Sequence, residues 1–142
     1  MDERKQGRMT KDGIRIYDKQ DFAGMHQAGA LAAQILDDIA PLVVPGATTG
    51  AIDAEITRMV EEADATSATI GYKGYQHASC ISVNHVVCHG IPGDKRLKDG
   101  DILNVDVTVI AGTLGDATAS APPPYCTWSA PSMRLVSRLF RS

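Results

Sequence analysis

The sequence of 142 residues is long enough for one domain with its own core, and its composition, 44% hydrophobic and 22% charged, is typical of a soluble globular protein. This composition excludes collagen-like, disulfide-rich and largely disordered proteins. The net charge of −3 gives no general attraction to nucleic acids or membranes, because both bind clustered lysines and arginines.

The sequence contains three cysteines, and no two of them form a Cys-x-x-Cys pair. The odd number argues against a secreted disulfide framework, and the spacing argues against a zinc site made of thiolates. Residues 1–12 are mostly polar and charged, which predicts a flexible extension and no signal peptide. No apolar run reaches the roughly 18 residues of a membrane span, so we expect a cytoplasmic protein.

Apolar residues recur at helical spacing between residues 18 and 40, which predicts an amphipathic helix. Asp18 and Asp21 are candidates for its N-cap, because short carboxylate side chains accept hydrogen bonds from the first free N–H groups. Pro41 is expected to end the helix, because proline lacks an N–H donor.

A second helix is predicted after the turn that Pro45 and Gly46 form. Its N-cap is Thr48 or Thr49, since either hydroxyl could accept from the first turn. The residues expected on its inner face are Ile52, Ile56, Met59, Val60 and Ala63.

The next part of the sequence is rich in Thr, Gly, Tyr and Val, which favours strands and turns. We predict a strand at residues 78–88, a turn at 90–93, and the strongest strand of the chain at 102–110. Alternation in the last strand assigns one face to Leu103, Val105, Val107 and Val109. The other face carries Asn104, Asp106 and Thr108.

The polar face of the last strand has two interpretations. The simpler one is the solvent-exposed side of an antiparallel sheet. The alternative is a metal site, in which Asp106 and Asp116 face each other across a hairpin with divalent cations between them. A three-residue loop ending at Gly112 would pair the two aspartates, whereas a two-residue loop would turn Asp116 away. The sequence leaves both loops open.

Histidines give a second group of candidates. His89 follows an apolar run and precedes a tight turn, where its imidazole could reach a cleft and hydrogen-bond a substrate, or could be satisfied by the turn backbone. His26, His77 and His85 are predicted to be surface residues. His85 and His89 are four positions apart, but they lie in a predicted strand and turn and not in a helix, so the signal for a helical metal site is weak.

Several segments together resemble type 1 methionine aminopeptidases, the bacterial type. The resemblance spans residues 13–116 and includes both predicted helices. Its motifs are VPGATTG at 44–50, GYKGY at 71–75, CISVN at 80–84, VVCHGIP at 86–92 and LKDGDILNVDVTVI at 97–110. Their order and spacing favour this family over the related aminopeptidase P and prolidase enzymes.

The resemblance implies an α/β (α+β) fold, the first half of a pita-bread aminopeptidase, with helices packed on a curved antiparallel sheet. It also implies two divalent metal ions per complete site (cobalt, iron, manganese or zinc), one chelated by Asp106 and both bridged by Asp116. His89 would contact the substrate and act in catalysis. The side-chain pocket for methionine would include Tyr72, Tyr75 and Cys80.

The reaction that the resemblance implies is hydrolytic removal of the N-terminal methionine from nascent proteins, with nascent chains and the ribosome as partners. The family takes one histidine and two glutamates from a second half, whereas this sequence has no His or Glu after Asp116. Residues 117–142 are instead rich in Pro, Ser and Arg, which predicts a disordered segment unrelated to residues 13–116.

Besides lacking the second half, the sequence departs from the family pattern at three places. The interval from Asp106 to Asp116 is one residue short, Gln76 replaces a proline, and His85 replaces a glutamate. We therefore expect a truncated methionine aminopeptidase that is inactive alone. The competing hypothesis is a non-enzymatic remnant that binds peptide or ribosome. A half-enzyme that completes its site by dimerising is disfavoured, because two copies would supply aspartates but no glutamate at the positions of the missing ligands.

Overall fold

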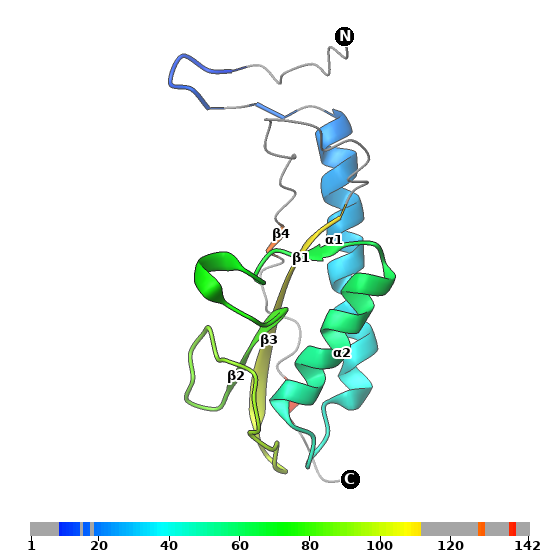
Figure 1. Cartoon of the computed structure of the whole chain (residues 1–142), viewed down its shortest axis with the longest axis vertical. Coiled ribbons are helices and arrows are strands. Elements are labelled where there is room, and N and C mark those ends of the chain that lie inside the picture. Colours follow the sequence, from blue (N-terminus) through cyan, green and yellow to red (C-terminus); the bar gives the residue numbers. More distant parts are fainter. Residues whose placement is uncertain (1–8, 15, 18, 112–127, 130–136, 139–142) are drawn as a thin grey trace.

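The computed structural model describes residues 9–14, 16–17, 19–111, 128–129 and 137–138. Two helices lie side by side and cover one face of a small antiparallel sheet (Figure 1). Helix α1 packs against strand β3 and helix α2, and α2 packs against strands β1 and β2. The predicted α+β class, with helices on an antiparallel sheet, is confirmed.

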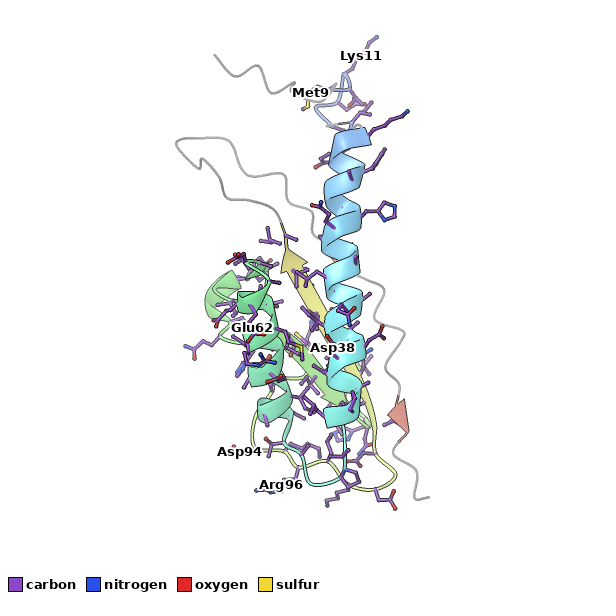
Figure 2. The ribbon with its side chains drawn as sticks, turned by 90° about the vertical axis from the view of Figure 1, so that its right-hand side faces the viewer. Met9, Lys11, Asp38, Glu62, Asp94 and Arg96 are labelled. Carbon is purple, nitrogen blue, oxygen red and sulfur yellow. The ribbon has the colours of Figure 1, made fainter. Side chains whose placement is uncertain are left out.

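Helix α1 spans Lys19–Ile39, and a 3-10 turn, Ala40–Leu42, follows it. The helix ends before Pro41, as predicted. Asp21 lies inside the helix and is therefore not its N-cap, while Asp18 lies outside the described residues. Figure 2 shows α1 as a long helix whose first turns extend past α2 and the sheet, with Met9 and Lys11 near its start.

Helix α2 spans Thr49–Glu62, and Thr48 is its N-cap, because the Thr48 hydroxyl accepts a hydrogen bond from the Ala51 N–H at 3.1 Å. The predicted inner face is confirmed at four of five positions, since three are buried and Met59 is partly buried against the core, and it is wrong at Ala63, which is exposed just beyond the helix. The buried residues of α2 are Thr49, Ile52, Asp53, Ile56 and Val60.

Strand β3, Ile102–Ile110, has the predicted bounds, and each of the other strands in the described part of the chain pairs with it in antiparallel orientation. Strand β1 (Thr66–Ser67) pairs with its end, and strand β2 (Ser79–Val83) pairs with its middle. Two further strands, β4 (Trp128–Ser129) and β5 (Ser137–Arg138), also pair with it.

The predicted strand 78–88 is too long, because β2 ends at Val83. Asn84 adopts φ = 55°, a left-handed conformation that takes the chain out of the sheet. The loop 84–101 that follows returns to β3. Asn84 closes this loop, since its backbone N–H donates to the Ile102 carbonyl at 2.9 Å and its side-chain Oδ1 accepts from the Ile102 N–H at 3.1 Å.

One hydrophobic cluster joins the helices to one face of β3. The predicted inward residues of β3 are all buried in it, together with Ile35, Ile39, Ile52 and Ile56 of the helices. Because side chains alternate along a strand, Asp106 lies on the opposite face, which the helices do not cover. The fold therefore leaves the polar face of β3 available for a site.

Most of residues 1–12 and 117–142 lies outside the described chain, so the predicted extension and disordered segment remain predictions. Among the helices that the structure describes, none is long and apolar enough to cross a lipid bilayer.

Candidate metal and substrate site

Asp106 lies at the centre of the polar face of β3, directly opposite Cys80 of β2 in the strand register. Residues paired in this way project on the same face of an antiparallel sheet, so the two side chains are neighbours. The Asp106 Oδ1 atom is buried, and no described residue hydrogen-bonds to it. A buried carboxylate oxygen without a partner is unfavourable. This observation is at odds with a purely solvent-facing role for the strand's polar face.

Tyr75 and Cys80 are brought together, as the predicted pocket requires. The Tyr75 hydroxyl donates to the Ser79 carbonyl at 2.8 Å, and the Cys80 thiol donates to the Tyr75 oxygen at 3.6 Å. Burial, followed by the hydrogen bond with Cys80, raises the pKa of Tyr75. The phenol is therefore a neutral hydroxyl next to the thiol.

Tyr72 does not join this pair. Its side chain is 66% exposed, and the Lys73 ammonium lies 5.5 Å from its ring centroid. The two residues belong to a short 3-10 turn, Tyr72–Gly74, in which Lys73 adopts φ = 49°. Tyr75 and Cys80 are thus in contact while Tyr72 is exposed, and the assignment of all three to a methionine pocket stays a prediction.

His89 is exposed and adopts φ = 54°, a conformation that is uncommon for residues other than glycine. Because β2 ends at Val83, His89 lies in a loop and not at a strand end as predicted. Gly90 fixes the segment against β2, since its carbonyl accepts from the Ile81 N–H at 2.8 Å and its N–H donates to the Ser82 hydroxyl at 3.0 Å. The backbone next to His89 is therefore hydrogen-bonded to β2, the strand that carries Cys80.

Asp116 lies outside the described residues, so the choice between the two hairpin loops stays open. Within the described ranges, no group of three or more His, Cys, Asp or Glu side chains is placed to hold a metal ion.

One buried polar group was missed by the sequence analysis. Asp53 of α2 is only 6% exposed and accepts from the Ser79 N–H at 2.9 Å and the Ser79 hydroxyl at 2.6 Å. His77 Nδ1 lies 3.0 Å from the other Asp53 oxygen, and its side chain is 33% exposed, so His77 is only partly the surface residue that was predicted. The signal was the position of Asp53 in the apolar stripe of α2, where an unpartnered carboxylate would be costly.

Residues 23–124 match metallopeptidase family M24. The methionine aminopeptidase of Salmonella typhimurium strain LT2 is 52% identical over 99 residues, which are 68% of this chain and 38% of that protein. The methionine aminopeptidase of Escherichia coli strain K12 is 51% identical over 108 residues, 74% of this chain and 41% of that protein.

Solved structures agree. The crystal structure of methionine aminopeptidase from Rickettsia prowazekii aligns with a TM-score of 0.68 and 47% identity, covering 69% of this chain and 40% of that chain. Prolidase from Pyrococcus furiosus, at 17% identity and a TM-score of 0.55, shares the fold alone. The predicted pita-bread relationship is confirmed, and this chain spans about 40% of the length of the relatives it matches. The chain therefore belongs to metallopeptidase family M24, and its sequence is similar to the first part of methionine aminopeptidases.

Proposed function

We propose that this chain supplies the N-terminal half of a methionine aminopeptidase site, which removes the first methionine from nascent proteins in the cytoplasm. The observation that carries the proposal is the buried, unpartnered Oδ1 of Asp106, next to the Tyr75 and Cys80 pair. A cation would satisfy that oxygen, and oxygen ligands suit divalent metals. The ribosome is a further proposed partner.

The residues have separate roles in this proposal. Asp106 would ligate one of two divalent metal ions, and Asp116 would contribute a second carboxylate. When bound, the ions would polarise the scissile carbonyl and activate a water molecule. The apolar faces of Tyr75 and Cys80, with Tyr72, would bind the methionine side chain, which suits a narrow pocket. His89 would hydrogen-bond the substrate amide and assist its departure.

The 142 residues alone are proposed to be inactive, because two aspartates supply fewer ligands than two metal ions need, about four to six each. The alternative function is binding of peptide without hydrolysis. That alternative would rest on two departures from the family pattern, Gln76, which is next to Tyr75 in the sequence, and His85, which is in the same loop as His89.

The test combines this chain with the C-terminal part of the Escherichia coli relative, as a fusion and as separate chains. Methionine release from a Met-Ala-Ser peptide is measured with added manganese or cobalt. The 142-residue chain alone is expected to give no release, and the fusion is expected to give metal-dependent release. Asp106→Asn should abolish this release, whereas the exposed Asp94→Asn should not.

Release by the 142-residue chain alone, lost on Asp106→Asn, would overturn the proposed inactivity. A folded fusion that binds the peptide without releasing methionine would favour the binding function.

A further inference from the structure

The Asp53 carboxylate is the centre of a buried polar network between α2 and the start of β2. One oxygen accepts two hydrogen bonds from Ser79, and the other faces His77. Ser79 is fully buried. Removal of a carboxylate from water is costly unless hydrogen bonds replace its hydration, so these contacts are what make the burial of Asp53 tolerable.

The network continues from Asp53 to the proposed pocket. The Ser79 residue that Asp53 holds by its N–H and hydroxyl also presents its carbonyl to the Tyr75 hydroxyl at 2.8 Å. Tyr75 in turn accepts from the Cys80 thiol at 3.6 Å. Three consecutive links therefore connect a helix side chain to Tyr75 and Cys80, two of the three residues proposed for the pocket.

His77 fixes the same segment from its other side. Its ring contacts Asp53 of α2 and lies edge-on to Tyr75, with ring centroids 5.4 Å apart. Its carbonyl accepts from the Thr69 hydroxyl at 2.7 Å. Polar contacts of Tyr75, His77, Ser79 and Cys80 therefore hold the segment 75–80 in place along its whole length.

We propose that Asp53 is a positioning residue for the methionine side-chain pocket, which it acts on through Ser79 by fixing the Tyr75 hydroxyl and the Cys80 thiol. This inference rests on the proposed function for the identity of the pocket. Asp53 itself touches neither the pocket nor substrate. The inference deepens the proposed function, because it names a residue of helix α2 that sets the positions of the pocket side chains.

The test measures how fast N-ethylmaleimide alkylates Cys80 in the 142-residue chain, with exposed Cys88 as the internal reference and peptide mapping by mass spectrometry. Asp53→Ala is expected to raise the Cys80:Cys88 rate ratio about tenfold. Ser79 loses its buried acceptor in this variant, so the Tyr75 hydroxyl and the Cys80 thiol that depend on Ser79 are no longer held in place. Asp53→Asn retains an acceptor for Ser79 and is expected to give a smaller rise.

Two controls separate positioning from general loss of stability. Val43→Ala removes buried core volume away from the network and should leave the ratio within about twofold, although it lowers stability. Asp37→Asn makes the same chemical change at an exposed helix position and should also leave it unchanged. Circular dichroism establishes that each variant folds, and Asp53→Asn decides the matter if Asp53→Ala does not fold.

Folded Asp53 variants with an unchanged ratio would overturn the inference, and so would an equal rise in Val43→Ala. A separate arm adds L-methioninamide to the unsubstituted chain, where occupation of the pocket should slow alkylation of Cys80. Lack of protection there would count against the proposed pocket, whereas the Asp53 comparison would still report on positioning. The two failures are therefore distinguishable.

Discussion

The β2–β3 pair and the loop 84–101 both carry proposed site residues, and different interactions hold them in place. Asp106 and Cys80 lie opposite each other in a regular antiparallel register, over a core in which alternate residues of β3 are fully buried. His89 lies in a loop whose side chains are mostly exposed, with Val87 92% exposed. Figure 2 shows Asp94 and Arg96 of this loop at the far end of the molecule from Met9.

The difference between the two regions lies in what each depends on. The strand pair depends on buried apolar area, which many residues share. Around His89 the loop depends on a few polar contacts, at Gly90 and at the Asn84 closure, and on left-handed backbone at Asn84 and His89. Its later part is held more firmly, because residues 93–97 hydrogen-bond to residues 46–50 and Leu97 is buried. A single substitution in the loop can therefore displace a site residue, while the fold of the strand pair persists.

The largest expected effect belongs to His89. In the fusion with a C-terminal half, His89→Ala should lower the turnover number for a Met-Ala-Ser peptide by about 10²–10⁴-fold, the usual contribution of a positioned proton-handling group. His85→Ala, an exposed histidine of the same loop, is the matched control and should change turnover little. Equal losses for the two variants would show that the wrong histidine was chosen.

The core gives the next effect. Ile56 is fully buried, so Ile56→Ala should lower the free energy of unfolding by about 2–5 kcal/mol. Val87→Ala in the exposed loop should change it by less than about 0.5 kcal/mol. Urea unfolding of the 142-residue chain measures both. A large cost for Val87→Ala would mean that the loop is covered by other parts of the chain in solution.

Regular periodicity explains what the sequence could predict. Strand β3 has the expected bounds because its alternation is strict over the whole element, and Thr48 and Pro41 delimit the helices by simple backbone chemistry. The end of β2 was misplaced because Val86 and Val87 extend an apolar run that the left-handed Asn84 interrupts, and a single sequence does not reveal that backbone state.

The site was predictable only in part for a related reason. Asp106 was a candidate from alternation, and its proximity to Cys80 follows from the register, which the sequence leaves open. The roles of His89 and the pocket residues came from the family resemblance and stay predictions. Asp53 and His77 were missed because their contact joins residues 24 positions apart, on different elements.

Gly90 gives a moderate expected effect on the loop. A Cβ atom there would lie 2.1 Å from the Ile81 carbonyl oxygen, so Gly90→Ala must displace the loop or β2. We expect a loss of about 1–3 kcal/mol in the free energy of unfolding, as for other overpacked sites. Gly93→Ala, where a Cβ would meet no atom within 4 Å, should cost less than about 0.5 kcal/mol. Equal urea midpoints for the two variants would contradict the close approach of Gly90 to β2.

The smallest effect concerns the closure of the loop, where the Asp101 carboxylate accepts from the Asn84 side-chain amide at 2.9 Å and the Lys98 N–H at 2.8 Å. These two hydrogen bonds, the Asn84 bond first, lower the pKa of Asp101 from its ordinary value of 3.8. A carboxyl group whose pKa is lower in the folded state stabilises the fold above the unfolded pKa. That contribution is lost as the pH falls through the folded value.

Asp101→Asn should therefore be less stable than the unsubstituted chain at pH 7, by less than about 1 kcal/mol, because the group is near solvent and screened. The difference should shrink once the pH falls below the ordinary value of 3.8. Urea midpoints between neutral pH and acid measure it, with exposed Asp94→Asn as the control that shows no such trend. A difference that stays constant with pH would mean that the Asp101 charge does not contribute to closing the loop, and that Asn84 holds the loop closed through the Ile102 backbone alone.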